Sequence, residues 1–284
     1  RSCSSSNSFW ARVSSSLCLY DKDTSKSVKR ETKVPQEPNK ISLRESVKEL
    51  SGIAIKMKNP HQKKIIQKIS HYLCNMNIFE KLGLVLPGVE NPARYIGGEA
   101  NSVVKKHSQM LAQMAFVFPD IYEIGMSNNG MRILYHVINR EPDLLCEVAF
   151  APWDDMAKEM RRLDIPLYTH ATYTPVKDFD AIGMSLQTEL NFTNVPYVLE
   201  LAGLEAFSLN RKEEDPIVLG GGPAMANPEP VADFFDAFMI GDGEEVIVKV
   251  LRCIGQARKE NVSKKEILKR LSFIDGVYVP SLRE

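Results

Sequence analysis

The sequence lacks any close pair of cysteines. Its five cysteines, Cys3, Cys18, Cys74, Cys146 and Cys253, are scattered along 284 residues. An odd, unpatterned set argues against a disulfide framework and against a zinc site, and it favours reducing surroundings. We therefore interpret Cys146 and Cys253 as small buried hydrophobic residues.

The sequence also lacks a net charge, because it contains 36 basic and 36 acidic residues. No bulk field then draws the chain to nucleic acid or to a membrane surface. The longest apolar runs are far too short to span a bilayer, while an apolar fraction of 44% suits an ordinary globular core. Phosphate-binding signatures are also absent: there is no G-x-x-x-x-G-K-[ST], and no G-x-G-x-x-G follows the first expected strand.

The first 85 residues differ from the rest in composition and in the pattern of their apolar residues. Residues 1–42 form a low-complexity stretch whose first 20 residues are rich in serine, contain two arginines and have no acid. This composition resembles an organellar transit peptide, which would place the protein in a chloroplast or mitochondrion; a disordered tail, with a cytoplasmic location, is the alternative. Residues 43–85 show two helical patterns, around 43–50 and 65–74, and we predict a helical extension there.

Residues 86–284 alternate between strand and helix patterns, after an irregular lead-in up to about residue 101. Short apolar runs predict strands at 115–118, 144–150, 179–186, 216–219 and 234–240. Residues 120–125 are expected to be a loop, with a helix starting at Ser127 as its N-cap. Further helices are expected at 153–163, at 190–202 before Gly203, and after two capping-box spacings, Asp242 with Glu245 and Ser263 with Glu266.

Five strands alternating with helices predict a doubly wound α/β fold with a mostly parallel, five-stranded sheet. We expect the flavodoxin-like, Rossmann-like strand order, with the first and third strands central. Ligands of such sheets bind at the carboxyl ends of the strands. Glycine or small polar residues follow four of the five strands, which favours a sizeable ligand at that edge, because glycine lets a ligand approach the backbone.

The loop after the first strand reads D-x-Y-x-x-G, at Asp120, Tyr122 and Gly125. It resembles the D-x-H-x-x-G motif of cobalamin-binding domains, with tyrosine in place of histidine. Residues 183–187, GMSLQ, are similar to the S-x-L element of that family, and Gly220-Gly221 matches its paired glycines. The segment FDAFMIGDGEE is similar to the end of cobalamin-type domains that precede a radical S-adenosylmethionine (radical SAM) barrel. The resemblance implies a set of cofactor-binding residues: Asp120, Tyr122, Gly125, Ser185, Gly220, Gly221 and Gly243.

Longer strings, among them FPDIYEIGMSNNGMRILYHVIN and IVLGGGPAMANPEPVADFFDAFMIGDGEE, resemble the N-terminal domain of one radical SAM subfamily. The resemblance covers about residues 86–282 and implies that cobalamin is bound without a protein ligand to cobalt, because a phenol that titrates near ~10 is a poor ligand at neutral pH. No metal site is expected within the chain. His107, His136 and His170 have no partner at metal-ligand spacing, and capping explains Asp233, Asp236 and Asp242. Glu189 and Asn191 could contact a ligand at the rim.

The C-x-x-x-C-x-x-C motif that holds the 4Fe–4S cluster of radical SAM enzymes is absent. We expect the cluster and the S-adenosylmethionine site in a C-terminal barrel of the same polypeptide, with this chain as a fragment that is inactive alone. The resemblance leaves the substrate open, with RNA as one candidate. Two alternatives remain: an α/β docking module that no longer binds cobalamin, and a flavin or nucleotide binder. We expect no membrane partner.

Overall fold

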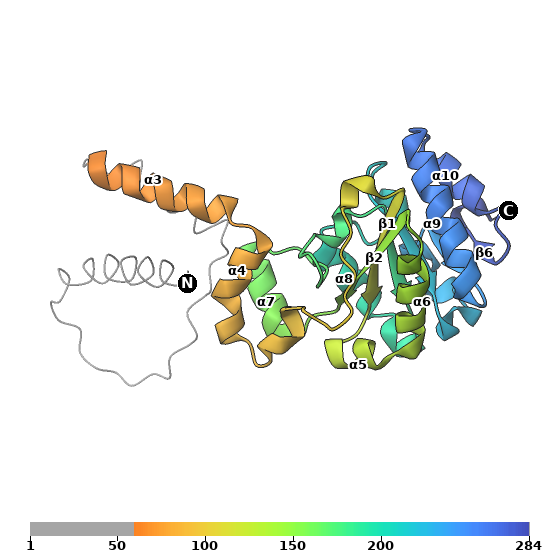
Figure 1. Ribbon diagram of the computed structural model, residues 1–284, viewed down its shortest axis with the longest axis horizontal. Coiled ribbons are helices and arrows are strands. Elements are labelled where there is room, and N and C mark those ends of the chain that lie inside the picture. Colours follow the sequence, from red (N-terminus) through yellow and green to blue (C-terminus); the bar gives the residue numbers. More distant parts are fainter. Residues whose placement is uncertain (1–59, 284) are drawn as a thin grey trace. The chain divides into compact units, whose positions relative to one another are not determined.

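A six-stranded sheet, mostly parallel, lies at the centre of the computed structural model (Figure 1). The structure describes residues 60–283, apart from six side chains in the first helix: Pro60, Lys63, Ile69, Ser70, Leu73 and Cys74. All described residues belong to one unit, residues 41–284. The predictions for residues 1–42 and for a helix at 43–50 therefore lie outside the described residues.

The strands, in chain order, are β1 (Ala112–Phe118), β2 (Leu144–Phe150), β3 (Ala181–Ser185), β4 (Ile217–Gly221), β5 (Ala237–Met239) and β6 (Val277–Tyr278). They lie in the order β2-β1-β3-β4-β5-β6. The first five strands are parallel, with β1 and β3 inside the sheet, so the predicted flavodoxin-like order is confirmed. The sixth strand was not predicted; it pairs antiparallel with β5.

Helices cover both faces of the sheet, as the near-continuous apolar strands require. In β1, Ala115 and Val117 face a core that includes residues of α4 (Ile78–Val85), α7 (Asp154–Leu163) and α8 (Asn194–Ala202). The alternate residues Met114 and Phe116 face the other core, formed with α6 (Asn129–Arg140), α9 (Gly243–Lys259) and α10 (Lys264–Leu271). Figure 1 shows α6, α9 and α10 grouped together, away from α7 and α8.

The helix boundaries correct several sequence predictions. Residues 120–125 are not all loop, because α5 occupies Tyr122–Ser127. Ser127 is not the cap of the next helix; Asn128 is, and its side chain accepts the amide hydrogen of Met131 at 2.8 Å. Ser127 instead donates to the carbonyl of Ile124. The boundary at Gly203 is confirmed, since it ends α8 with a left-handed backbone, φ +72°.

The two predicted capping boxes differ in outcome. Ser263 accepts the amide hydrogen of Glu266 and caps α10, but the box is half formed, because the Glu266 side chain accepts from Arg270 instead. Asp242 does stand at the N-cap of α9, but its side chain makes no capping hydrogen bond. The prediction of a capping box at Asp242 and Glu245 is therefore wrong, because the Asp242 carboxylate makes no hydrogen bond to the first turn of α9.

The lead-in to β1 is tied by tyrosines to the connection between α7 and β3. The Tyr168 hydroxyl donates to the carbonyl of Tyr95 at 2.9 Å, and the Tyr173 hydroxyl donates to that of Ile96 at 2.6 Å. The remaining helix is α3 (Pro60–Asn75), where a helix was predicted. Among the helices of residues 60–283, none is long and apolar enough to cross a membrane.

Candidate functional site

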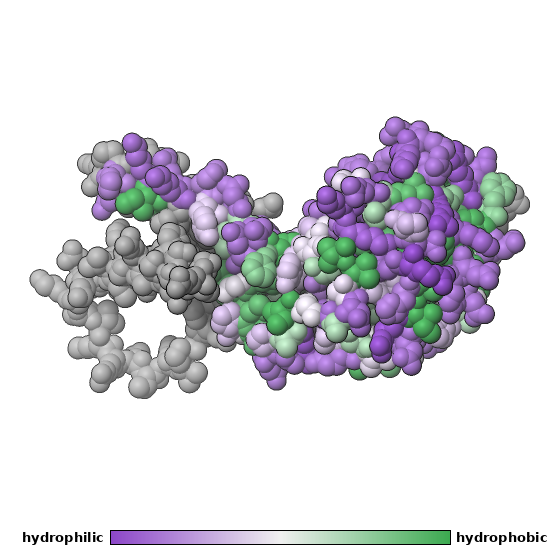
Figure 2. Space-filling view, viewed as in Figure 1, coloured by the Kyte–Doolittle hydropathy of each residue, from purple (hydrophilic) through white to green (hydrophobic). Residues whose placement is uncertain are grey.

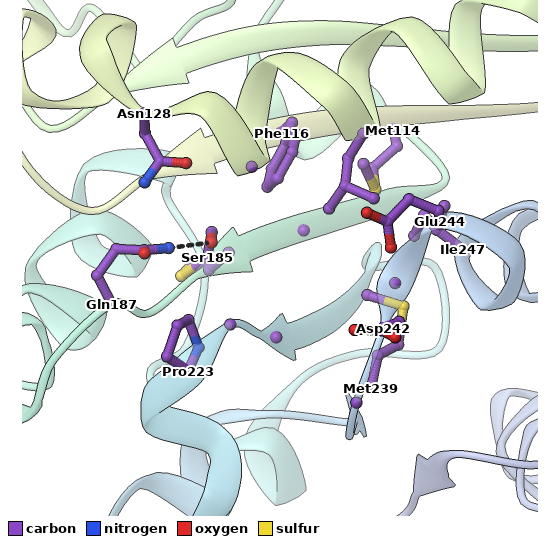
Figure 3. Close-up of a pocket in the computed structure, with 18 residues that line it drawn as sticks. Met114, Phe116, Asn128, Ser185, Gln187, Pro223, Met239, Asp242, Glu244 and Ile247 are labelled. Atoms are coloured by element: carbon purple, nitrogen blue, oxygen red, sulfur yellow. Dashed lines mark hydrogen bonds between the residues drawn. The ribbon is translucent and has the colours of Figure 1, made fainter.

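A crevice of about 250 Å³ opens at the carboxyl ends of β3, β4 and β5 and extends between α6 and α9 (Figure 3). The loops that follow these three strands form its rim, and the first turns of α6 and α9 form one wall. It reaches down the sheet as far as Met114, near the start of β1. This is the edge at which parallel α/β sheets bind their ligands.

The floor of the crevice is apolar. Met114 and Phe116 of β1, Leu134 of α6, Met239 of β5 and Ile247 of α9 contribute its side chains. In Figure 3, Phe116 lies between Asn128 and Met114, Ile247 lies beside Glu244, and Met239 lies beside Asp242. Such a floor suits a neutral, flat group more than a charged one, since burying a charge without a partner is costly.

The rim is built from glycine. Six of the 18 lining residues are glycines, which bring backbone rather than side chains to the cavity. Gly221 is the most informative, because a Cβ added there would meet nothing closer than Met239 Cε, at 3.7 Å. A Cβ there would therefore make only ordinary contacts, and a larger side chain would extend into the cavity. Gly222 differs: its φ of +101° and the closeness of the Leu186 backbone require glycine for structural reasons.

Polar groups gather at the mouth. Gln187 donates to the Ser185 hydroxyl at 2.7 Å, and the carboxylates of Asp242 and Glu244 lie across the crevice from them (Figure 3). Of the described residues that line the crevice, none is Lys, Arg, His or Cys. The site therefore offers hydroxyl, amide and carboxylate groups and the backbone amides at the start of α9, but no imidazole or thiol.

Three of the seven predicted cofactor-binding residues, Ser185, Gly221 and Gly243, line this crevice. Gly125 and Gly220 do not line it, because each packs closely against an aromatic ring. A Cβ at Gly125 would lie 2.4 Å from the Phe150 ring, and one at Gly220 would lie 2.5 Å from the Phe238 ring. Both glycines serve packing within the sheet and its cores.

Asp120 and Tyr122 also lie outside the crevice lining. Asp120 accepts hydrogen bonds from the backbone of Ile121 and, at 3.4 Å, from Asn191. Asn191, proposed above as a ligand contact, instead accepts from the amides of Gln187 and Thr188 and so holds the loop after β3. Glu189 is exposed and does not line the crevice.

Tyr122 is held in an aromatic cluster beside β2. Its ring lies edge-on to Phe150 and stacks on His170, with centroid distances of 5.3 and 6.0 Å. Burial raises the pKa of the Tyr122 phenol, and the neighbouring Glu99 carboxylate raises it further. His170, buried and 3.8 Å from Glu99, in turn lowers the pKa of that carboxyl. Tyr122 therefore stays protonated at neutral pH.

Several crevice residues were not among the predicted ones. Met114 and Phe116 belong to an apolar run typical of a buried strand. Such a run does not show which of its residues line a cavity. The sequence analysis predicted Ser127 rather than Asn128 as the N-cap of α6, although asparagine is as strong an N-cap signal. No group of three or more potential metal ligands occurs among residues 60–283 as far as their side chains are described.

The family described as "Radical SAM proteins, N-terminal" matches residues 130–280, more than half of the chain. The chain belongs to this family. Within the radical SAM N-terminal domain, the match includes Ser185, Gly220, Gly221 and Gly243, whereas Asp120, Tyr122 and Gly125 precede it.

Among curated proteins, the domain is 25% identical over 146 residues to an uncharacterized protein of the archaeon Methanocaldococcus jannaschii. That stretch is 50% of this chain and 27% of the archaeal protein, so the chain spans about a quarter of its relative's length. No solved structure matches the chain.

Proposed function

We propose that this chain is the cofactor-holding domain of a radical SAM iron–sulfur enzyme and that its crevice takes cobalamin. Two findings support the proposal: membership of the radical SAM N-terminal family and a crevice at the ligand-binding edge of the sheet. The observation that carries it is that Gly221 lines the crevice although no neighbouring protein atom lies close enough to require glycine there. Such a residue fits a role in letting a ligand pass along the backbone.

The lining residues fit one part of cobalamin well. The apolar floor suits the neutral aromatic base of its nucleotide arm, and Ser185, Gly221 and the first amides of α9 suit the sugar and phosphate that follow the base. A cavity of about 250 Å³ is too small for the macrocycle, which would have to lie outside it. With neither His nor Cys in the described lining, this domain would hold the cofactor without a cobalt ligand.

In the whole enzyme, cobalamin would supply methyl-group or electron transfer beside the radical SAM centre. The residues of this chain would bind and orient it. The 4Fe–4S cluster and S-adenosylmethionine would belong to the C-terminal barrel, because three closely spaced thiolates are needed for the cluster and the sequence has none.

A docking module is the second candidate, favoured by apolar side chains exposed at the same edge of the sheet. Leu190, after β3, is 85% exposed, and Ile124 in α5 and Ile240 after β5 are also exposed. On the face drawn in Figure 2, however, the apolar areas are small and are separated by polar ones. In this candidate, the edge would contact the barrel or a substrate such as RNA without holding a cofactor.

Titration of the purified chain with hydroxocobalamin, followed by visible absorption and equilibrium dialysis, separates the two. The cofactor proposal predicts one equivalent bound, and loss of binding in Gly221→Val, whose branched side chain would enter the cavity. Gly83→Val is the control, because a Cβ at Gly83 in α4 would likewise clash with nothing, having no atom within 4 Å, and Gly83 lies outside the lining. Tight binding by Gly221→Val, or none by the parent chain, would count against the proposed site.

A further inference from the structure

A second cavity, of about 260 Å³, lies at the amino-terminal edge of the sheet. Its lining includes Asp236, directly before β5, whereas the crevice includes Met239 at the other end of that strand. The two cavities therefore open at opposite ends of β5. The first turn of α10 and the segment after β6 complete the second one.

The buried charged side chains at this cavity are one carboxylate and two cations. The carboxylate of Asp236, which is 4% exposed, accepts the amide hydrogen of Val218 at 2.7 Å. The same carboxylate lies 3.3 Å from Arg211 Nη1 and 3.2 Å from Lys264 Nζ. One carboxylate thus faces two cations, both of them about nine-tenths buried. Lys264 itself lines the cavity, and the exposed Lys265 adds a third positive charge beside it.

The acids of the neighbouring loop lie outside the cavity lining. Glu213 accepts the backbone amide hydrogen of Lys264, and Asp215 accepts that of Lys212. Neither carboxylate is part of the cavity lining. Burial lowers the pKa of Lys264 and that of Arg211, and the charges of Asp236 and, less strongly, Asp215 oppose this shift.

The mouth of the cavity is apolar. Leu209 is 87% exposed and Leu282 is 37% exposed, and both line the cavity together with Leu268. The lining carries two lysines and one aspartate, a net charge of +1, and Lys264 pairs with Asp236 while Lys265 is exposed. This charge beside exposed leucines suits a molecule that carries an anionic group on an apolar body. The crevice at the other edge has the opposite character, with carboxylates at its mouth and an apolar floor.

We infer that the second cavity is a binding site for a small organic anion, a carboxylate or a phosphate monoester borne on an apolar group. The anionic oxygens would contact Lys264 and Lys265, and the apolar group would pack against Leu209 and Leu282. This site is separate from the proposed cobalamin site and does not depend on it.

Isothermal titration of the whole chain with phenyl phosphate and with benzoate tests the inference; inorganic phosphate and benzyl alcohol are the comparison ligands. We expect at least one of the two aromatic anions to bind with a stoichiometry of one, more tightly than phosphate, and the neutral alcohol not to bind. Which anion binds better distinguishes a phosphate from a carboxylate ligand.

Two surface variants locate the binding. Lys265→Gln should weaken it by about fivefold or more, through loss of one charge-assisted contact, and Leu209→Asp should weaken it by placing a negative charge at the mouth. Lys269→Gln, an exposed lysine of the same helix outside the lining, should have no effect. Absence of binding at millimolar ligand, equal affinity for phosphate and the aromatic anions, or unchanged affinity in both variants would overturn the inference.

Discussion

At the scale of single residues, the site depends on which face of a strand a glycine lies on. Gly220 and Gly221 are neighbours in β4, and successive strand residues point to opposite faces. Gly220 meets the buried rings of Phe238 and Phe235, whereas Gly221 opens into the crevice. The sequence shows the pair of glycines but not this division, because the division depends on rings that another strand supplies.

This division predicts different costs for the same substitution. Gly220→Ala should lower the free energy of unfolding by about 1–3 kcal/mol, because its Cβ would lie 2.5 Å from the Phe238 ring in a packed core. Gly221→Ala should change it by less than about 1 kcal/mol, because its Cβ meets only ordinary contacts. Urea denaturation of the two variants measures both values, and equal losses would contradict the assigned faces.

Tyr122 stands where the resemblance places a cobalt-ligating histidine, yet it packs on Phe150 and His170 away from the crevice. Tyr122→Phe should therefore change the dissociation constant for hydroxocobalamin by less than about threefold. The titration described above measures this. A tenfold or greater loss would mean that the phenol contacts the cofactor.

Glu99 makes stability depend on pH. Its pKa is lowered in the folded chain, chiefly by His170, so the carboxylate stabilises the fold above its unfolded pKa of about 4.3, and this contribution is lost as the pH falls through the lower, folded value. Glu99→Gln should lower the free energy of unfolding by roughly 1 kcal/mol at pH 7 and by less near pH 3. Urea denaturation at the two pH values tests this; a difference independent of pH would contradict it.

At the scale of elements, two helices begin at the crevice, and only one has a side-chain cap. Asn128→Ala should destabilise the chain by about 1 kcal/mol, because it removes the acceptor for the Met131 amide at the start of α6. Asp242→Ala should cost less, because that side chain makes no capping bond to α9. Thermal unfolding of the two variants gives the comparison, and a larger loss for Asp242→Ala would show that its carboxylate does cap the helix.

Most of the sheet could be predicted from the sequence, because each parallel strand is a short, mostly apolar run. The sixth strand could not, since the two residues Val277–Tyr278 are too short to show any periodicity. Helix α5 was hidden by Pro119 and Gly125, which read as loop signals; yet Pro119 precedes the helix and Gly125 lies within it against Phe150.

The candidate site was predictable in location but only partly in its residues. Parallel strands bring their carboxyl ends to one edge whatever their sequence, so Ser185, Gly221 and Gly243 could be grouped in advance. The floor, including Met114 and Phe116, depends on how α6 and α9 pack over the sheet. That packing brings together residues more than 100 positions apart, and no local pattern reveals it.

At the scale of the whole molecule, binding and radical chemistry should be separable. The sequence contains no closely spaced cysteines of the kind that hold the cluster of radical SAM enzymes, and we propose that the cluster lies in the C-terminal barrel. After anaerobic reconstitution with iron, sulfide and a strong reductant, we expect no 5′-deoxyadenosine from this chain alone. Formation of that product would overturn the assignment of the radical chemistry to a C-terminal barrel.

The central claim is that the crevice at the carboxyl ends of β3, β4 and β5 is the cofactor site, and hydrogen exchange with and without hydroxocobalamin tests it most directly. We predict slower exchange at the backbone amides around Ser185, Gly221 and the first turn of α9, with no change around Lys264 at the opposite edge. Protection confined to other segments, or no protection at saturating cofactor, would contradict the account.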